Sequence, residues 1–298
     1  MKVTVNDAIA DINAVQWNRL VRNGCPMLRH EFLRAAEHSG SVSPESGWIP
    51  KHLTCWHDDE IIAAMPLYEK SHSWGEFVFD WSWARAYEQA GFDYYPKLVS
   101  ALPFTPAQGH RLLLRDKADG ETAKALLDAA ISLTTESDCS SLHVLFPHEE
   151  ELPLLQESGL RLRKDCQFHW HNQDYGDFDD FLATFSSAKR KKARRERRRV
   201  EEAGIRFRHV HGGDIDATLW NTLYRLISIT FMRRGSLPYF NLNFFVQLGA
   251  SLPDNVLAVL AEKDSEVIAA AIFFESDDVL YGRYWGAAGH YDALHFET

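Results

Sequence analysis

Two short segments of this chain recur far downstream, and this internal repeat constrains the fold more than any other feature. Trp17-Asn18-Arg19-Leu20 recurs as Trp220-Asn221-Thr222-Leu223, an offset of 203 residues. The segment 60–69 matches 266–275 at an offset of 206 residues. Apolar strands that follow a turn resemble one another, so either match alone carries little weight. Two matches in the same order and register favour duplication of one unit.

Each copy is expected to place two helices before a β-hairpin. In the first copy the spacing of apolar and turn-forming residues predicts helices at 11–21 and 30–38, a Ser-, Gly- and Pro-rich loop at 39–50, and hairpin strands at 53–56 and 61–68. In the second copy it predicts a strand at 205–210, helices at 217–231 and 242–248, and hairpin strands at 256–261 and 267–274. The common order supports the duplication.

The first copy continues well beyond its hairpin, whereas the second does not. The first continues with predicted strands at 76–81, 97–104, 142–146 and 160–170, and with helices at 83–89, 121–134 and 149–157. The second has only 277–298 after its hairpin, so we expect this chain to be a truncated form of a longer protein. The order predicts an α/β (α+β) chain of tandem acetyltransferase-like (GNAT) domains with mixed, mostly antiparallel sheets, the second domain being truncated at its C-terminus.

The expected domains are residues 1–172, a first GNAT-like domain, and 173–298, which hold a basic helix and the incomplete second domain. The linker at 172–176 precedes Asp177, which is expected to cap a helix over 178–185 with an apolar stripe.

A basic run at 186–202 is expected to form one solvated helix that ends near Gly204. Nine of the 32 Lys and Arg residues lie between Lys189 and Arg199, although the whole chain carries a net charge of −10. Like charges four residues apart repel on a helix, so an anionic neighbour would stabilise it. We expect phosphate binding by five of these cations: Lys189, Arg190, Arg194, Arg195 and Arg198. The alternative is a solvated helix whose charge is answered by acidic residues elsewhere in the chain.

Composition narrows the classes of function and partner. The acidic balance of 32 basic against 42 acidic residues argues against binding DNA. No signal peptide and no apolar run of membrane-spanning length is present, so we expect no membrane insertion and a cytoplasmic location. The four cysteines show no CxxC spacing and are expected to be reduced. The sequence leaves the oligomeric state open.

The chain resembles a bacterial family named for peptidoglycan biosynthesis or recognition, related to the Fem-type aminoacyl ligases within the acetyltransferase superfamily. The resemblance rests on an aromatic block at 76–87 (EFVFDWSWARAY) and on the segments 94–98, 103–106 and 109–113. The basic run leading into 201–205 and the segment 281–286 (YGRYWG) resemble the second half of that family. The resemblance implies an enzyme, a GNAT-type N-acyltransferase that transfers an acyl or aminoacyl group to an amine, with acyl-CoA or aminoacyl-tRNA as donor. The implied partner is a phosphate-bearing small molecule or tRNA.

Transfer to an amine requires groups that move protons and that stabilise an oxyanion. Asp80, within the aromatic block, is expected to accept from a substrate amine, and Tyr284 to protonate the leaving group. The expected substrate-binding residues are Trp81, Trp83, Tyr87, Arg233, Arg234, Tyr239 and Arg283. The alternatives are an aromatic core capped by Asp80 and, around Tyr284, an ordinary strand.

The loop at 106–111 is the expected site for the donor's phosphates and acyl carbonyl, through Gln108, Gly109 and Arg111. The alternative is a simple turn into an apolar strand. No metal site is expected, because the pairs His169/His171 and His209/His211 have no third ligand nearby in the sequence. Two other functions stay open: a non-catalytic recognition module, and a tRNA- or RNA-binding protein that uses the basic helix.

Overall fold

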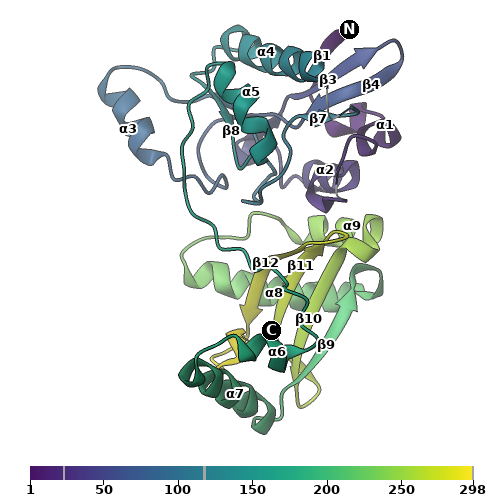
Figure 1. Ribbon diagram of the computed structural model, residues 1–298, viewed down its shortest axis with the longest axis vertical. Helices are drawn as coiled ribbons and strands as arrows, with labels where there is room; N and C mark the ends of the chain where they lie inside the picture. Colours follow the sequence, from purple (N-terminus) through teal and green to yellow (C-terminus); the bar gives the residue numbers. More distant parts are fainter. Residues whose placement is uncertain (23, 117–118, 297–298) are drawn as a thin grey trace.

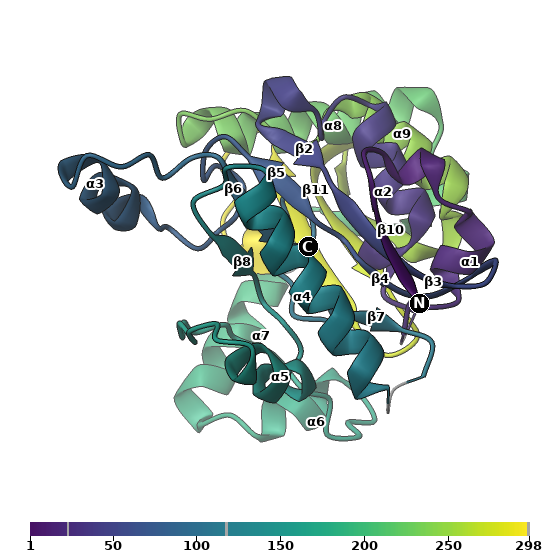
Figure 2. The ribbon, with the colours of Figure 1, turned by 90° about the horizontal axis from the view of Figure 1, so that it is seen from above.

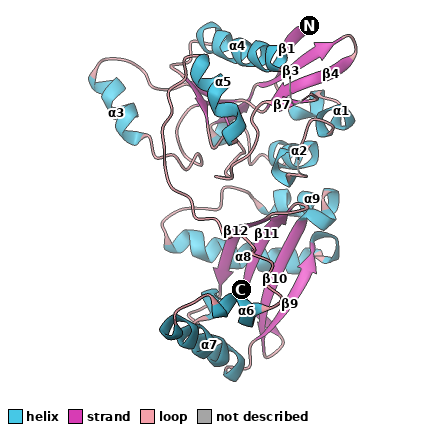
Figure 3. Ribbon diagram, in the orientation of Figure 1, coloured by secondary structure: helices cyan, strands magenta, loops and turns pink. Residues whose placement is uncertain are grey.

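The computed structural model describes residues 1–22, 24–116 and 119–296. It shows a mixed α/β protein with three four-stranded sheets (Figures 1 and 3). Two sheets are built from residues before 145 and the third from residues after 205. We refer to residues 1–172 as the first half and to 173–298 as the second half.

The first sheet of the first half has the order β1-β3-β4-β7, with every pair antiparallel. Its strands are β1 (Lys2–Asn6), β3 (His52–His57), β4 (Glu60–Met65) and β7 (Leu113–Leu114). Helix α4 (Gly120–Glu136) covers one face and buries Leu126 and Ala130 against Leu53 and Ala63. Asp119 caps this helix by accepting from the Thr122 amide.

The second sheet of the first half has the order β2-β5-β6-β8. Its strands are β2 (Trp48–Pro50), β5 (Tyr68–Lys70), β6 (Lys97–Ser100) and β8 (Leu142–Val144). Strands β6 and β8 are parallel because the chain crosses over through α4 between them. The short helix α5 (Leu152–Glu157) follows β8.

The sheet of the second half has the order β9-β10-β11-β12, again with every pair antiparallel. Its strands are β9 (Arg206–His211), β10 (Val256–Lys263), β11 (Glu266–Glu275) and β12 (Leu280–Ala287). Helix α8 (Ala217–Arg233) lies so close to β12 that a Cβ on Gly286 would stand 2.2 Å from the Leu226 carbonyl oxygen. Helices α6 (Phe178–Ala183), α7 (Ser187–Glu202) and α9 (Leu242–Ser251) complete this half.

Short 3₁₀ turns join many of these elements: η1 (Ile9–Asp11), η2 (Pro26–Leu28), η3 (Pro44–Ser46), η4 (Glu149–Glu151), η5 (Gly212–Asp214), η6 (Pro253–Asn255) and η7 (Leu294–Phe296). Within the residues that the structure describes, no helix combines the length and the apolar character needed to cross a bilayer.

The sheet β1-β3-β4-β7 of the first half and the sheet of the second half share features that support the proposed duplication. The strand orders β1-β3-β4-β7 and β9-β10-β11-β12 correspond, and Trp17 on α1 (Ala14–Asn18) and Trp220 on α8 are both buried. Each hairpin also carries a one-residue bulge, at Ile62 in the first half and at Ile268 in the second. These two residues are separated by the same 206-residue offset as the sequence match.

The halves are joined through α2 (His30–His38) and α9, which pack against each other. Phe32 and Phe244 are each the third residue of their helix, and their ring centroids lie 5.2 Å apart. The Asn241 side-chain amide donates to the Ser39 carbonyl oxygen across the junction at 2.7 Å. One hydrophobic cluster therefore extends through both halves.

Most of the predicted elements are confirmed. The basic run forms α7, capped by the Ser186 side chain, and Gly204 adopts a left-handed φ of +74° after its end. Asp177 caps α6 as expected, and both hairpins are present.

The strands predicted at 76–81 and 160–170 are wrong. Residues 76–80 form a loop before α3 (Trp81–Gln89), and the fully described segment 160–177 forms neither helix nor strand. Alternating side chains suggested strands at both places, but a strand also requires a neighbouring strand to pair with. The helix predicted at 11–21 is shorter and begins after Asn13, whose side chain accepts from the Gln16 amide.

Candidate functional site

The halves meet at a cluster of aromatic side chains. The Phe104 ring, from the loop after β6, stacks on Tyr239, with centroids 5.2 Å apart and planes 3° from parallel. Phe77 meets the same Tyr239 ring edge-on at 5.8 Å. Tyr239 lies between α8 and α9, so the predicted substrate residue of the second half contacts two rings of the first.

Arg283 enters this cluster from β12. Its Nη2 donates to the Phe104 carbonyl oxygen at 2.5 Å, and its guanidinium carbon lies 6.0 Å from the Phe77 ring centroid. Its Nε is buried and has no hydrogen-bond partner among the described residues. The guanidinium therefore lies beside aromatic rings, and its Nε–H group is available to donate a hydrogen bond.

A β-bulge explains how Arg283 reaches this position. Along the β11–β12 ladder, Ile272 pairs with Tyr284 and Phe273 with Gly282, so Arg283 is the extra residue. Adjacent strand residues normally point to opposite faces, and a bulge re-aims the side chain. The Arg283 guanidinium consequently lies 5.5 Å from the Tyr284 ring centroid.

The Tyr284 side chain is 6% exposed and packs against Phe245, with ring centroids 5.4 Å apart. Its hydroxyl is buried and completes no hydrogen bond of normal geometry with the described residues, and the side chain that approaches it is that of Arg283. Burial raises the pKa of Tyr284 to about 12, against the opposing effect of the Arg283 charge. The hydroxyl is therefore protonated at neutral pH and can donate.

Asp80 lies in a buried ionic network centred on Lys97 of β6. The Lys97 Nζ donates to Asp80 Oδ2 at 2.5 Å and to Glu76 Oε2 at 2.8 Å, and the Tyr94 hydroxyl donates to Asp80 Oδ2 at 2.6 Å. Burial of Asp80 opposes its ionisation, but these hydrogen bonds outweigh it and hold its pKa at about 2. Because Asp80 Oδ2 is bound by both Lys97 and Tyr94, Asp80 is placed to anchor the loop before α3.

The predicted aromatic pocket is instead an exposed helix. Trp81, Trp83 and Tyr87 are all exposed, and none of the nine residues of α3, every one of them described, is buried. Figures 1 and 2 show α3 standing away from the body of the first half. The structure thus separates these residues from Arg283 and Tyr239. Arg233 and Arg234 are exposed at the end of α8, in the connection that leads to Tyr239.

Hydrogen bonds within the predicted donor loop and with residues 145–147 hold this loop in place. Arg111 is fully buried and donates to the carbonyl oxygens of Ala107, Gly109, His110 and Leu145. The Gln108 side-chain amide donates to the Pro147 carbonyl oxygen at 3.3 Å, and the Gly109 amide donates to that of Phe146 at 3.1 Å. Arg111 therefore acts as a brace for this loop.

The five α7 cations that were predicted to bind phosphate fall into two groups. Arg190 donates to the Phe185 carbonyl oxygen at 3.1 Å, and Arg194 pairs with Asp179 at 2.8 Å. Lys189, Arg195 and Arg198 are exposed, and their side chains form no ion pair or hydrogen bond with the residues described. Figure 1 shows α7 at the end of the second half that lies away from the first.

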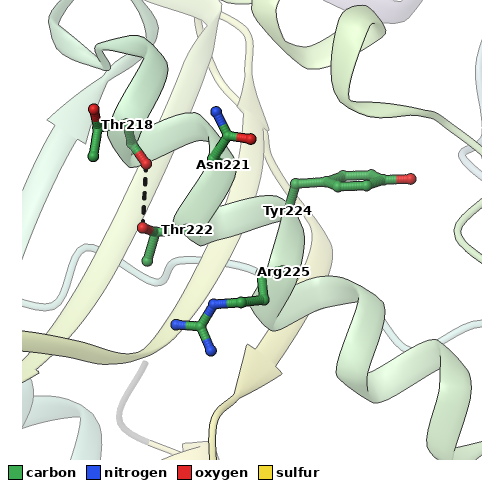
Figure 4. A pocket seen from close by; sticks show the side chains of 5 residues that line it. All are labelled: Thr218, Asn221, Thr222, Tyr224 and Arg225. Carbon is green, nitrogen blue, oxygen red and sulfur yellow. Dashed lines mark hydrogen bonds between the residues drawn. The ribbon is translucent and has the colours of Figure 1, made fainter.

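A shallow depression on α8 is lined by Thr218, Asn221, Thr222, Tyr224 and Arg225 (Figure 4). All five residues come from one helix, and the Thr222 hydroxyl donates to the Thr218 carbonyl oxygen at 3.2 Å. No described residue of the first half contributes to its lining. We therefore place the candidate site at the junction.

Four residues in or near the site were not predicted from the sequence: Phe77 and Phe104, which contact Tyr239, Phe231, which contacts Tyr239 and Tyr284, and Lys97 of the ionic network in the first half. Lys97 carried a usable signal, because a lysine within the apolar strand 97–100 requires a buried partner. The phenylalanines carried none, since ring contacts between segments far apart in the sequence depend on the packing of the halves.

The fold and the junction define a mixed α/β protein whose two halves both contribute side chains to one candidate site. The family profile for peptidoglycan biosynthesis/recognition matches residues 8–298. The chain therefore belongs to the FemAB-like family.

Solved structures agree with this assignment at the level of the fold. The structure of FemX matches with a TM-score of 0.53 and 11% identity, over 98% of this chain and 81% of that one. The C-terminal domain of a protein assigned as lysylphosphatidylglycerol synthetase, from Agrobacterium fabrum, matches with a TM-score of 0.52 and 10% identity, over 96% of this chain and 72% of that one. A search of curated proteins gave no match.

Proposed function

We propose that this protein transfers an acyl or aminoacyl group to an amine acceptor at the junction of its halves. The observation that carries the proposal is the bulge that brings Arg283 beside the buried, unpartnered hydroxyl of Tyr284. An unsatisfied buried hydroxyl costs stability, so its presence next to a cation favours a role with a ligand.

The proposed reaction assigns one role to each of these groups. The amine attacks the carbonyl carbon of an ester or thioester, and the Arg283 guanidinium stabilises the developing oxyanion. The new C–N bond forms as the bond to the leaving oxygen or sulfur breaks. The Tyr284 hydroxyl donates its proton to that leaving atom, and the proton lost by the amine restores it. Tyr239 and Phe104 supply the apolar walls.

We favour aminoacyl-tRNA over acyl-CoA as donor because α7 and the junction lie apart in the second half. A compact donor does not reach both, whereas a polynucleotide can contact Lys189, Arg195 and Arg198 while its acylated end enters the junction. The family description points to an acceptor from peptidoglycan metabolism. We expect the reaction to take place in the cytoplasm.

A recognition module without catalysis is the second candidate, favoured by the exposed aromatic rings of α3. Such rings can stack on sugars. Under this alternative the protein binds its ligand and forms no product.

A charge-reversal experiment tests the donor. The Lys189→Glu/Arg195→Glu/Arg198→Glu variant should abolish tRNA binding, and a gentler salt dependence should accompany any binding that remains. Arg161→Glu/Arg163→Glu/Lys164→Glu is the matched control, because it reverses three exposed cations outside α7. Equal losses of tRNA binding in both variants would show that the effect arises from the net charge of the protein and not from α7.

A transfer assay then separates the two candidate functions. Amide formation from aminoacyl-tRNA and an amine acceptor should occur in the wild type and fall in Arg283→Met, while tRNA binding stays unchanged. Ligand binding without product from either donor class would favour the recognition module.

A further inference from the structure

Three potential metal ligands gather beside the loop that Arg111 braces. His110 lies before β7, and His148 and Glu150 lie at the start of η4. One ligand atom from each residue lies within 4.8 Å of the others. The two imidazole rings stack with centroids 4.4 Å apart.

The backbone on both sides of this group is fixed. Gly109 and Pro147 form a parallel bridge, and the Arg111 Nε donates to the Leu145 carbonyl oxygen at 2.9 Å. Each histidine is therefore next to a residue of the bridge that holds the two segments together. The position of the pair does not depend on a long mobile loop.

The Glu151 carboxylate fixes the backbone next to both histidines. This carboxylate is 7% exposed and accepts from the amides of Arg111, Leu112 and His148. The His110 Nδ1 lies 3.7 Å from Glu151 Oε1. A carboxylate beside one ring nitrogen is the usual outer partner of a metal-bound histidine, because it orients the ring and leaves the other nitrogen free.

We propose that His110, His148 and Glu150 bind a divalent transition-metal ion, with Zn²⁺ as the best match. Two imidazoles and one carboxylate form a zinc ligand set that leaves a fourth position for water or a substrate group. Ca²⁺ and Mg²⁺ prefer oxygen ligands and fit this set poorly. The side chain of Glu150 is 68% exposed, so the ion has an entry path and the carboxylate can close the geometry.

This inference is independent of the proposed transferase activity. This site was not predicted from the sequence, because a helix and a strand separate His110 from His148 along the chain. The predicted absence of a metal site rested on the pairs His169/His171 and His209/His211, and neither pair belongs to this group.

Metal titration of the full chain tests the proposal. Protein stripped with a chelator should bind one Zn²⁺ by calorimetry, and Co²⁺ should give the absorption bands of a four- or five-coordinate site. The His110→Gln/His148→Asn variant should lose at least the roughly 10–100-fold in affinity that removal of an outer partner costs. Asn at 148 keeps a side-chain acceptor for the turn that His148 caps.

Two matched controls keep the outcome specific. His169→Gln/His171→Asn removes an exposed histidine pair whose rings lie 6.3 Å apart, and Zn²⁺ affinity should not change. Glu150→Gln should weaken binding, whereas Glu149→Gln, one residue away, should not. Absence of Zn²⁺ binding by the wild type, or equal losses in the site and control variants with thermal unfolding unchanged, would overturn the proposal.

Discussion

Arg283 donates to the main-chain carbonyl oxygen of Phe104 at 2.5 Å, and this bond joins β12 of the second half to a loop of the first. The bulge on β12 makes the contact possible, because it turns Arg283 toward the first half while Tyr284 stays in the pairing register. Residues from both halves thus define the candidate site. Its geometry depends on how β12, α8 and the loop before α3 are each held in place.

Lys97→Met should strongly destabilise the first half. Lys97 is fully buried, and its removal leaves Asp80 and Glu76 as uncompensated buried carboxylates. Breaking such a buried pair costs about 3–5 kcal/mol. Denaturant unfolding measures the loss, with Lys124→Met as control, because Lys124 forms an exposed pair with Asp128. Equal stabilities of Lys97→Met and the wild type would show that the network contributes nothing.

The stability of the protein should depend on the titration of Lys70. Its Nζ donates to the Gly47 carbonyl oxygen at 2.9 Å, and burial lowers its pKa to about 7. An unfolded lysine titrates near ~10.4, so between pH 7 and 10 the unfolded chain holds a proton that the folded chain has lost. The free energy of unfolding therefore rises as the pH increases through this window. Below pH 7, Lys70 is charged in the folded chain, and the cost of burying that charge lowers the stability by its full amount.

Lys70→Met removes the titrating group, so the stability of the wild type can be compared with that of this variant at each pH. The difference in unfolding free energy between the wild type and Lys70→Met should shift in favour of the wild type by roughly 3–4 kcal/mol from pH 6.5 to 10. Chemical denaturation at several pH values gives this difference. A difference that is constant with pH would contradict the lowered pKa.

Gly286→Ala should disturb the packing of α8 on β12. A Cβ at position 286 would meet the Leu226 carbonyl oxygen at 2.2 Å, whereas at Gly282, on the same strand, it would meet only Phe273 at 3.5 Å. We expect a loss of about 2 kcal/mol or more for Gly286→Ala and little change for Gly282→Ala. Thermal unfolding of the two variants provides the comparison, and equal midpoints would contradict this account of the α8 contact.

The sequence predicted the elements whose determinants are local. Ser186 and Gly204 mark the ends of α7, and alternation around a turn marks both hairpins. It did not predict that 160–170 is irregular, because strand formation there depends on a neighbour that no local pattern reveals.

The candidate site was only partly predictable for the same reason. Tyr239, Arg283 and Tyr284 were expected, and the structure brings them together. Asp80 was expected to contact the substrate, but its partner Lys97 lies in β6, distant in the sequence, and their ion pair is buried. The bulge that turns Arg283 is a property of the register between β11 and β12, and neither strand shows it alone.

The most direct test of the proposed function compares two hydroxyl deletions. Tyr284→Phe and Tyr68→Phe each remove a buried hydroxyl that has no partner among the described residues, and only Tyr284 lies beside Arg283. Neither variant should lose stability by more than about 1 kcal/mol, since no hydrogen bond is broken. In an aminoacyl-transfer assay, Tyr284→Phe should lose roughly 10²-fold or more in turnover and Tyr68→Phe should match the wild type. Wild-type turnover by a well-folded Tyr284→Phe would contradict the role of this hydroxyl and with it the proposed site.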